Sequence, residues 1–269
     1  MEQLIVLGTG NAMVTRCYNT CFAISDGAGE YLLVDAGGGS GILSQMEKAA
    51  VDVAHVHDMI VTHEHCDHLL GVIWILRKVG AMMLAGKYDG CLRIYCHQKL
   101  IPTIQAIADM TLQKKFTNLI GDRILLCPIT DGECNRLLAC DVTFFDIHST
   151  KAEQFGFTIK LKNGKTLVCL GDEPYNPICE PFIKGCDWML SEAFCLYSQR
   201  EKFKPYEKHH STVREACLLA QEMNVPNLVL WHTEDKNYDC RKELYLAEGQ
   251  QFYSGNLQVP YDLEVIDLK

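Results

Sequence analysis

The segment THEHCDHLLG, Thr62 to Gly71, crowds metal-binding side chains into one turn. In an extended segment, residues two apart point the same way, so His63 and His65 can bind one metal ion from a strand end. Asp67 and His68 follow where the chain is expected to turn into a helix, so they can face a second metal position nearby. Imidazole and carboxylate ligands suit Zn²⁺, Mn²⁺ or Fe²⁺.

Such a cluster supplies two ligands per metal, so each metal needs partners from elsewhere in the chain. Three other expected strand ends carry suitable residues: His148 in FFDIHS, Asp172 in LVCLGD and His232 in LVLWH. One histidine at a strand end is more often an ordinary hydrogen-bonded residue. Sheet architectures place sites at strand ends, so the three ends together with the cluster predict a dinuclear metal site.

Short strand-like runs alternate with helical patterns along the chain. We expect one domain over residues 1–269, built from two αβ halves of about 1–150 and 151–269 that pack two sheets between outer helices. Ser40 and Ser211 are expected to cap helices. The expected strands are 4–8, 31–35, 58–62, 92–96, 123–127, 141–147, 155–161, 166–171, 188–193, 227–232 and 263–268. The expected helices are 40–51, a segment after His68, 98–115, 211–224 and a segment within 239–250.

Composition narrows the class of protein. The chain has 269 residues, 48% of them hydrophobic, which is enough for a substantial core. A net charge of −9 argues against a broadly nucleic-acid-coating surface, although a local basic patch remains possible. Met1 is followed at once by Glu2 and the strand-like LIVLG, and no apolar run approaches the roughly 20 residues that span a bilayer. We therefore expect a cytoplasmic protein without a membrane partner, and we interpret most of its 14 cysteines as reduced core residues.

The ordered motifs resemble the metallo-β-lactamase fold family. THEHCDH matches the His-x-His-x-Asp-His signature of that family, and the three later strand ends match its later motifs in order. The resemblance implies an α/β fold, the αββα sandwich, with metals along one edge between the sheets. It also implies two divalent metal ions, with Zn²⁺ expected first and Mn²⁺ or Fe²⁺ as alternatives. The implied ligands are His63, His65 and His148 for the first metal, Asp67, His68 and His232 for the second, and Asp172 as the bridge.

Within this fold the chain looks most like ribonuclease Z and its small phosphodiesterase relatives. The opening LGTGNAMVTRCYNTCFAI, the fragment LLVDAGGG and the segments SEAF and HHST are similar to that group. The resemblance implies that His210 contacts the scissile phosphate and protonates the leaving group, and that Glu192 orients His210. Asp67 could also accept a proton from the attacking water. The alternatives are a surface histidine at 210 and an ordinary surface carboxylate at 192.

Several features depart from ribonuclease Z. That enzyme usually carries a long arm that grips tRNA, placed between the counterparts of His148 and Asp172, whereas residues 149–171 have room only for two strands and a hairpin. Ser191 replaces a histidine of the family motif, and Cys66 stands where glycine is common. The basic stretch REKFKPYEKHH, residues 200–210, could hold a phosphate or be a solvated loop. These departures favour a smaller substrate than a tRNA precursor.

The sequence thus predicts a dinuclear-metal hydrolase, most simply a phosphodiesterase acting on a small or cyclic nucleotide or another phosphodiester through a metal-activated hydroxide. One alternative is a ribonuclease Z-like RNA endonuclease. Another is a hydrolase of lactams, lactones or thioesters, and a third is a non-enzymatic metal-holding scaffold. A homodimer is possible because relatives are often dimers. Asp35 is expected either to support a metal ligand or to cap a turn.

Overall fold

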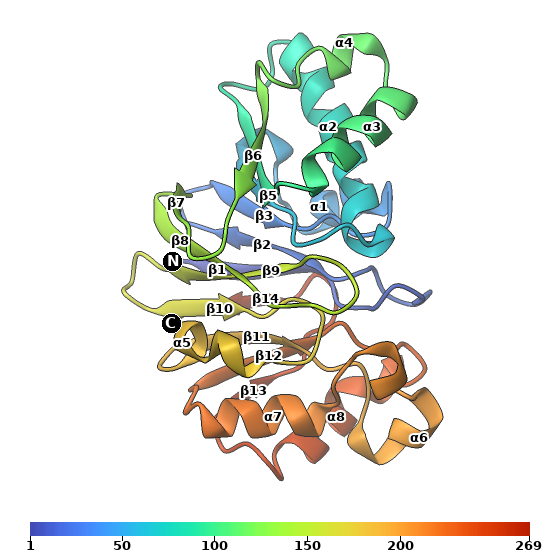
Figure 1. The fold of residues 1–269 in the computed structure, drawn as a ribbon, viewed down its shortest axis with the longest axis vertical. Coiled ribbons are helices and arrows are strands. Elements are labelled where there is room, and N and C mark those ends of the chain that lie inside the picture. The colour runs from blue at the N-terminus through green and yellow to red at the C-terminus, as the bar shows by residue number, and fades with distance from the viewer.

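The structure is a computed structural model that describes residues 1–269. Two seven-stranded sheets pack face to face, and helices cover the outer face of each sheet. Figure 1 shows α1, α2 and α3 to the right of the strands of the first sheet, in the upper part of the molecule, and α5, α7 and α8 below the second sheet. This arrangement is the expected αββα sandwich.

The first sheet has the strand order β14-β1-β2-β3-β4-β5-β6. The pairs from β14 to β3 are antiparallel, and those from β3 to β6 are parallel, because helices return the chain to the same end of the sheet. Its strands are β1 (Gln3–Gly8), β2 (Cys21–Ser25), β3 (Tyr31–Val34), β4 (Val56–Ile60), β5 (Leu92–His97), β6 (Ile124–Ile129) and β14 (Val265–Asp267). Its helices are α1 (Gly41–Lys48), α2 (Cys66–Leu84), α3 (Leu100–Thr111) and α4 (Lys114–Thr117).

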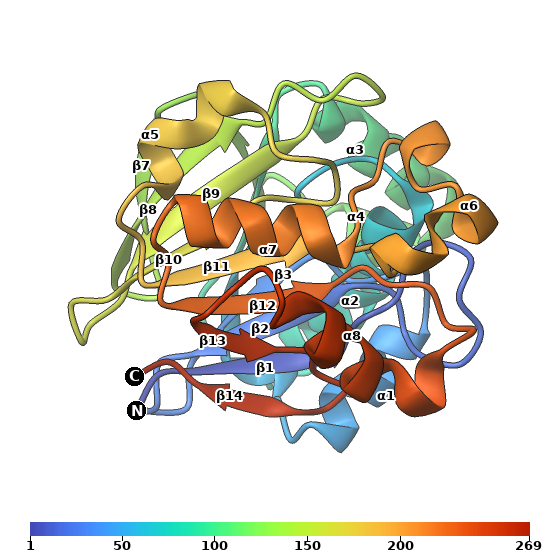
Figure 2. The ribbon, with the colours of Figure 1, turned by 90° about the horizontal axis from the view of Figure 1, so that it is seen from below.

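The second sheet has the order β13-β12-β11-β10-β9-β8-β7 and repeats the pattern, with antiparallel pairs from β7 to β10 and parallel pairs from β10 to β13. Its strands are β7 (Cys134–Leu137), β8 (Cys140–Asp146), β9 (Phe155–Lys160), β10 (Thr166–Cys169), β11 (Trp188–Glu192), β12 (Asn227–Trp231) and β13 (Asn256–Gln258). Its helices are α5 (Glu180–Ile183), α6 (Arg200–Phe203), α7 (Val213–Glu222) and α8 (Arg241–Gly249), and Figure 2 shows α7 and α8 lying across the outer face of the sheet. Single 3₁₀ turns lie at Val53–His55, Pro177–Cys179, Tyr197–Gln199, Tyr206–Lys208 and Tyr238–Cys240.

Three hydrophobic clusters fill the three spaces between the four layers. Alternate residues of β1 separate them: Leu4 and Val6 belong to the cluster between the sheets, whereas Ile5 and Leu7 belong to the cluster under α1, α2 and α3. This follows from the pleat of a strand, whose successive side chains point to opposite faces. The third cluster packs α7 and α8 on the second sheet. The sandwich is therefore held by burial on both faces of each sheet.

The structure differs from the predicted elements in several places. The expected helix 98–115 is two helices, α3 and α4. Strands β2, β7 and β13 were not predicted; β7 and β13 are edge strands of only four and three residues. Thr212, rather than Ser211, caps α7, because its side chain and that of Glu215 form a reciprocal capping box. The chain passes from the first sheet to the second between β6 and β7, and β14 returns it to the first sheet.

The carboxyl ends of four strands from both sheets converge at one edge of the sandwich. Asp35 follows β3 and the histidine motif follows β4 in the first sheet, whereas Asp172 follows β10 and His232 follows β12 in the second. The backbone N–H of Phe155, at the start of β9, donates to the carbonyl of Thr62 at 3.2 Å and joins the two sheets there. The fold thus gathers polar strand ends from distant parts of the chain.

A close contact below this edge yields a stability prediction. Gly71 of α2 lies against the loop after β3, where a Cβ atom would come within 1.8 Å of the Ala36 carbonyl oxygen. Gly71→Ala should therefore lower the free energy of unfolding by more than about 2 kcal/mol, measured by denaturant titration.

Gly80→Ala, in the same helix, is the matched control. A Cβ atom there meets only side-chain atoms, the nearest being Phe116 Cδ1 at 3.0 Å. Its effect should stay within about 1 kcal/mol, because alanine favours the helix. Equal unfolding free energies for the two variants would show that α2 can move away from the loop.

Candidate metal centre and its cleft

Six of the seven predicted ligand residues lie together at the convergent strand ends. They form two groups, in each of which one potential ligand atom per residue lies within 4.8 Å of the others. We call His63, His65 and Asp172 the first group, and Asp67, His68 and His232 the second group. All but His65 are buried, so their nitrogen and oxygen atoms are largely withdrawn from water.

The carboxylate of Asp172 lies between the two groups. Its Oδ2 atom is 3.5 Å from Nε2 of both His63 and His68 and 3.6 Å from Nε2 of His232. These separations exceed a good hydrogen bond. They match the spacing of two ligands on one tetrahedral cation, which is about 3.3 Å for bonds of about 2.0–2.1 Å. His68 Nε2 is also buried without a hydrogen-bond partner, so the donor set fits two divalent cations sharing Asp172.

Asp35 fixes the orientation of two of these histidines. Its Oδ2 lies 2.8 Å from Nδ1 of His68 and accepts the Thr62 hydroxyl at 2.8 Å, and that hydroxyl lies 2.9 Å from Nδ1 of His63. With both Nδ1 atoms engaged, both Nε2 atoms face Asp172, and His63 Nε2 also lies 2.9 Å from Nδ1 of His65. The Thr62 N–H donates to the other Asp35 oxygen at 2.8 Å. Asp35 adopts a left-handed φ of 54°, which side chains rarely adopt, so it both supports ligands and shapes the turn.

The surroundings of Asp172, Asp67 and His232 favour the protonation states that bind cations, whereas those of His68 favour its protonated form. Burial alone would raise the pKa of Asp172, but the charge and hydrogen bond of His63 and the hydrogen bond of His68 outweigh it and hold that pKa well below its ordinary value. Burial would likewise raise the pKa of Asp67, but the hydrogen bond and charge of His68 outweigh it and hold that pKa below its ordinary value. Burial lowers the pKa of His232 to about 3, so its imidazole is neutral at neutral pH. Burial also lowers the pKa of His68, but the charge of Asp35 outweighs it and raises that pKa; a cation would replace the proton.

The structure does not place His148 with the other six residues. Strand β8 ends at Asp146, Ile147 is buried, and His148 takes a left-handed φ of 56° that leaves its side chain 42% exposed. Its Nδ1 lies 3.8 Å from Asp146 Oδ2, and it belongs to neither group. The structure therefore does not bring His148 to the first group, because the turn after β8 carries the side chain toward solvent, and its role as a ligand stays a prediction for the metal-bound protein.

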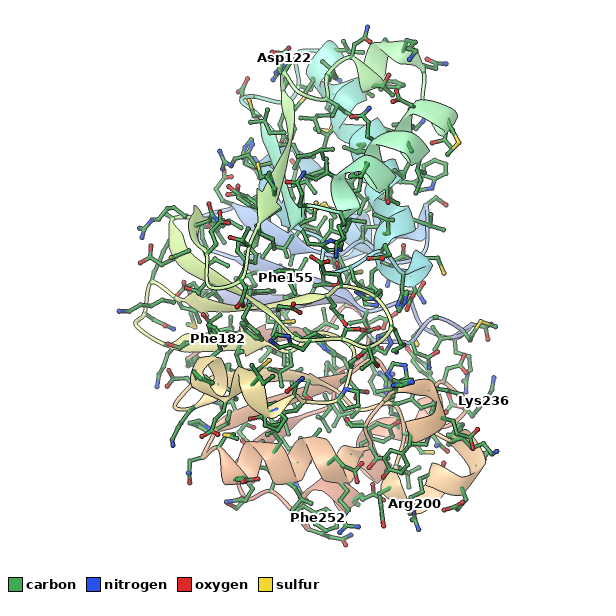
Figure 3. The ribbon with its side chains drawn as sticks, in the orientation of Figure 1. Asp122, Phe155, Phe182, Arg200, Lys236 and Phe252 are labelled. Carbon is green, nitrogen blue, oxygen red and sulfur yellow. The ribbon has the colours of Figure 1, made fainter.

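Gln154 contacts the first group from the same loop. Its side-chain Nε2 donates to Asp172 Oδ1 at 2.7 Å and lies 3.2 Å from His63 Nδ1, and the residue is 1% exposed. Sequence reasoning did not select Gln154, since a glutamine before a strand has no metal-binding signature. The neighbouring Phe155, labelled in Figure 3, starts β9 in the middle of the molecule.

A cleft of about 660 Å³ opens over these groups. Its floor includes Asp67, Asp172 and His232, and its walls come from the loops after β1, β11 and β12 and from the segment around α6. Asn11, Met13, Val14, Phe194 and Phe203 also line it. The cleft has the size of a small-molecule site.

His210 and Glu192 form a buried pair on one wall of this cleft. Glu192 is 1% exposed and His210 is 8% exposed, so neither is a surface residue. His210 Nδ1 lies 3.6 Å from Glu192 Oε2, and neither atom has another partner. The other Glu192 oxygen accepts the N–H of Ser211 at 2.5 Å, and the imidazole stacks on Phe194 with ring centroids 5.0 Å apart. These contacts hold the histidine ring against the cleft.

Three lysines line the cleft around the metal groups: Lys151, Lys208 and Lys236. Lys208, from the basic stretch 200–210, holds its Nζ 4.7 Å above the ring of Phe194. Lys236 is labelled in Figure 3 at the outer edge of the molecule. The cleft therefore combines a cation-binding floor with cationic walls, an arrangement that attracts anions. Sequence reasoning identified the basic stretch but missed Phe194, Lys151 and Lys236.

Comparison with known proteins agrees with this fold. The family model of the beta-lactamase superfamily domain matches residues 30–233. A protein called Ribonuclease Z from Bradyrhizobium sp. (strain ORS 278) is 24% identical, with 94% of this chain and 95% of that protein covered. The solved structure of the metallo-beta-lactamase fold protein YhfI from Bacillus subtilis has a TM-score of 0.80 at 19% identity over 98% of both chains. That of human tRNase Z, short form, has a TM-score of 0.73 at 19% identity over 99% of both chains.

These matches confirm the predicted metallo-β-lactamase fold and the resemblance to ribonuclease Z, and they support the predicted class of metal-dependent hydrolase. No helix of this chain combines the length and apolarity that crossing a membrane requires. All 14 cysteines are free and most are buried, as expected of core residues.

The Asp35 network predicts an effect on metal affinity. Asp35→Asn removes the carboxylate that faces His68 Nδ1 and Thr62 while keeping a side chain that tolerates a left-handed φ. Affinity for Zn²⁺, measured by competition with a chelator, should fall by about 10- to 100-fold.

Asp58→Asn is the control, because Asp58 is also a buried carboxylate of the first sheet but pairs with Arg93 at 2.6 Å. It should lower stability without changing metal affinity. An unchanged affinity in Asp35→Asn would mean that the histidines are oriented without this carboxylate.

Proposed function

This chain belongs to the beta-lactamase superfamily, and we propose that it is a dinuclear-metal phosphodiesterase acting on a small or cyclic nucleotide or a similar small phosphodiester. One observation carries the proposal: two candidate metal groups form the floor of a cleft whose walls present a histidine–carboxylate pair and three lysines. Hydrolysis of a phosphodiester needs stabilisation of the charge on the phosphoryl oxygens, an acid that protonates the leaving oxygen, and positive side chains that attract the anion. The metal groups, the histidine–carboxylate pair and the lysines could meet these three needs.

The two groups would hold the cations, most simply Zn²⁺ because imidazole predominates among the ligands. When bound, such cations supply Lewis-acid stabilisation of a phosphoryl group and lower the pKa of water toward neutrality. Asp172 would be shared between them through Oδ2, since Gln154 already engages its Oδ1. Asp67 lines the same floor and is the one carboxylate of the second group, so it could accept a proton from the attacking water.

His210 is assigned the role of general acid. Its Nδ1 faces the Glu192 carboxylate, so its Nε2, on the opposite side of the ring, is available to the cleft. Glu192 would keep the ring in that orientation and stabilise its protonated form. Stacking on Phe194 limits tilting of the ring. Protonation of a departing alkoxide is worth about 10²- to 10⁴-fold in rate.

Lys151 and Lys208 favour an anionic substrate. Lys151 Nζ donates to the Lys208 carbonyl at 3.2 Å, which brings the two basic segments together at the cleft. The acidic residues on the same wall are occupied: Glu234 accepts the N–H groups of the next turn, and Asp235 accepts those of Thr15 and Arg16. Two of the lysines also face carboxylates, since Lys151 Nζ lies 3.6 Å from Glu173 Oε1 and Lys236 Nζ lies 3.2 Å from Asp235 Oδ1. Lys208 and the bound cations would therefore supply most of the positive field that a ligand meets.

The size of the substrate is argued from the segment between β8 and the Asp172 loop. It holds only β9, β10 and a short turn, and the cleft volume suits a mononucleotide or dinucleotide. The runner-up is an RNA endonuclease, which the relative called Ribonuclease Z favours. A hydrolase of lactams, lactones or thioesters is less favoured, because the reacting carbonyl of those substrates is uncharged, whereas a phosphodiester carries its charge at the reacting centre. A cytoplasmic location and a homodimer stay predictions.

The proposal is tested by an activity screen of the metal-loaded protein. Substrates should include 2′,3′-cyclic and 3′,5′-cyclic nucleotides, linear dinucleotides, a tRNA precursor, a thioester and a β-lactam. We expect the highest kcat/KM on a nucleotide diester. Preferred cleavage of the tRNA precursor would support the runner-up, and preferred turnover of the thioester or lactam would overturn the phosphodiesterase proposal.

The general-acid role predicts a leaving-group dependence. His210→Ala should lower kcat by about 10²- to 10⁴-fold on an unactivated diester, and far less on bis(p-nitrophenyl) phosphate, whose leaving group needs no proton. Metal content should be unchanged, because His210 belongs to neither group.

His209→Asn is the matched control: it changes the adjacent exposed histidine and keeps a residue that tolerates its φ of 55°. It should retain the parent kcat on both substrates. An equal loss on the two substrates in His210→Ala would argue against proton donation.

A further inference from the structure

We infer that Arg241 is a positioning residue: it clamps the loop after β1 to the loop after β12 and thereby fixes His232 at the floor of the cleft. The inference rests on the proposed function, because the place of His232 matters only if the second group holds a cation. Arg241 itself neither lines the cleft nor belongs to a metal group, so its effect would pass through the two loops.

Arg241 is a cation enclosed in the protein. It is the first residue of α8, and none of it is exposed to solvent. Its two Nη atoms donate to the Thr233 hydroxyl at 2.7 Å, the Thr9 hydroxyl at 3.0 Å and the Pro260 carbonyl at 2.7 Å. A buried cation is costly unless its surroundings compensate for the lost water. These three acceptors replace that water, so the segments that carry them are held together around the guanidinium.

The Thr9 hydroxyl connects this cation to a carboxylate. It accepts from Arg241 and donates to Asp262 Oδ1 at 2.7 Å, which one hydroxyl can do because it is both a donor and an acceptor. The other Asp262 oxygen accepts the backbone N–H of Tyr18 at 2.6 Å. Thr9 and Tyr18 stand at the two ends of the loop between β1 and β2, so both ends of that loop are attached to the Arg241–Asp262 pair.

Backbone hydrogen bonds extend the clamp toward the metal groups. The Thr233 N–H donates to the Thr9 carbonyl at 3.0 Å. The Thr233 carbonyl accepts both the backbone N–H of Asn11 at 3.1 Å and its side-chain Nδ2 at 3.0 Å. Thr9 follows a strand of the first sheet and Thr233 follows a strand of the second, so these bonds join the sheets at the wall of the cleft that Asn11 lines.

His232 depends on its backbone for its orientation. Its Nδ1 atom is buried without a hydrogen-bond partner, whereas Nδ1 of His63 and of His68 is engaged. Its φ of 54° lies in the left-handed region, which a histidine adopts at a cost and keeps only where the surrounding structure holds it. Thr233 follows directly and is held through both its hydroxyl and its backbone. Loosening Thr233 would therefore free the imidazole to turn away from Asp172.

Four variants separate this clamp from general stability. Thr9→Val removes the hydroxyl that joins Arg241 to Asp262 and keeps a side chain of similar shape, whereas Thr9→Ser keeps the hydroxyl. Arg241→Lys keeps the charge but replaces the planar fork with a single ammonium. Arg123→Lys is its matched control, because Arg123 Nη2 also donates to two backbone carbonyls, at 2.7 and 2.8 Å, but at a place away from the cleft.

The first measurement is amide hydrogen exchange of the metal-free protein, monitored by NMR. A buried donor left without its acceptor should raise local opening about 10- to 100-fold. The N–H groups of Asn11 and Thr233 should therefore exchange faster by that factor in Thr9→Val and Arg241→Lys, and at the parent rate in Thr9→Ser and Arg123→Lys. Unchanged exchange at these two sites in Thr9→Val, or an equal acceleration throughout β8 and β9, would overturn the inference.

The second measurement is the affinity for Zn²⁺, by competition with a chelator. Thr9→Val should weaken it about 10- to 100-fold, as loss of support for a ligand does, and Thr9→Ser should keep the parent affinity. Arg241→Lys gives the same test should Thr9→Val fail to fold. Faster exchange with an unchanged Zn²⁺ affinity would show that the clamp does not position His232, and would overturn the inference. Neither measurement uses a substrate, so a parent protein that binds Zn²⁺ but hydrolyses no phosphodiester would reject the proposed function alone.

Discussion

The site depends on one buried carboxylate oxygen, Oδ2 of Asp172, toward which Nε2 atoms of three histidines point at 3.5–3.6 Å. A second carboxylate, Asp67, is buried beside them. Ionised groups are expensive to withdraw from water unless they are paired or coordinate a metal. Two cations would supply that compensation, since each would neutralise carboxylate charge and fill the space between ring nitrogens. Metal binding should for this reason be coupled to the stability of the protein.

The two sheets divide this task between them. The first contributes the histidine motif after β4 and its support from Asp35 after β3, and the second contributes Asp172 after β10 and His232 after β12. Neither sheet carries a complete set of ligands, so the hydrophobic cluster between the sheets sets the separation of the metal groups. The cleft arises at the same edge, because the loops that follow β1, β11 and β12 surround the strand ends. The packing of the two sheets therefore also determines the geometry of the metal site and its cleft.

Much of this arrangement could be predicted from the sequence. The spacing within THEHCDH predicts ligands for two metal ions. Asp172 and His232 could be predicted as further ligands because each is a metal-binding residue type that follows an apolar, strand-like run. His148 satisfies the same rule but lies apart from the two groups, because a left-handed turn after β8 directs its side chain toward solvent, and residue type alone does not encode that turn. Gln154 could not be predicted, since its role depends on a cavity beside Gly171 that exists only in the folded chain. Phe194 and Lys151 were missed for a similar reason: stacking and salt-bridge partners are set by loop conformation.

The most direct test of the account is a crystal structure of the zinc-loaded protein with anomalous diffraction data collected above and below the zinc absorption edge. The account predicts two zinc peaks about 3.5–4 Å apart, as in other two-metal sites, on either side of Asp172 Oδ2. One peak should lie at His63 and His65, and the other should lie at Asp67, His68 and His232. A single peak, or two peaks that do not share Asp172, would contradict the dinuclear centre on which the proposed chemistry depends.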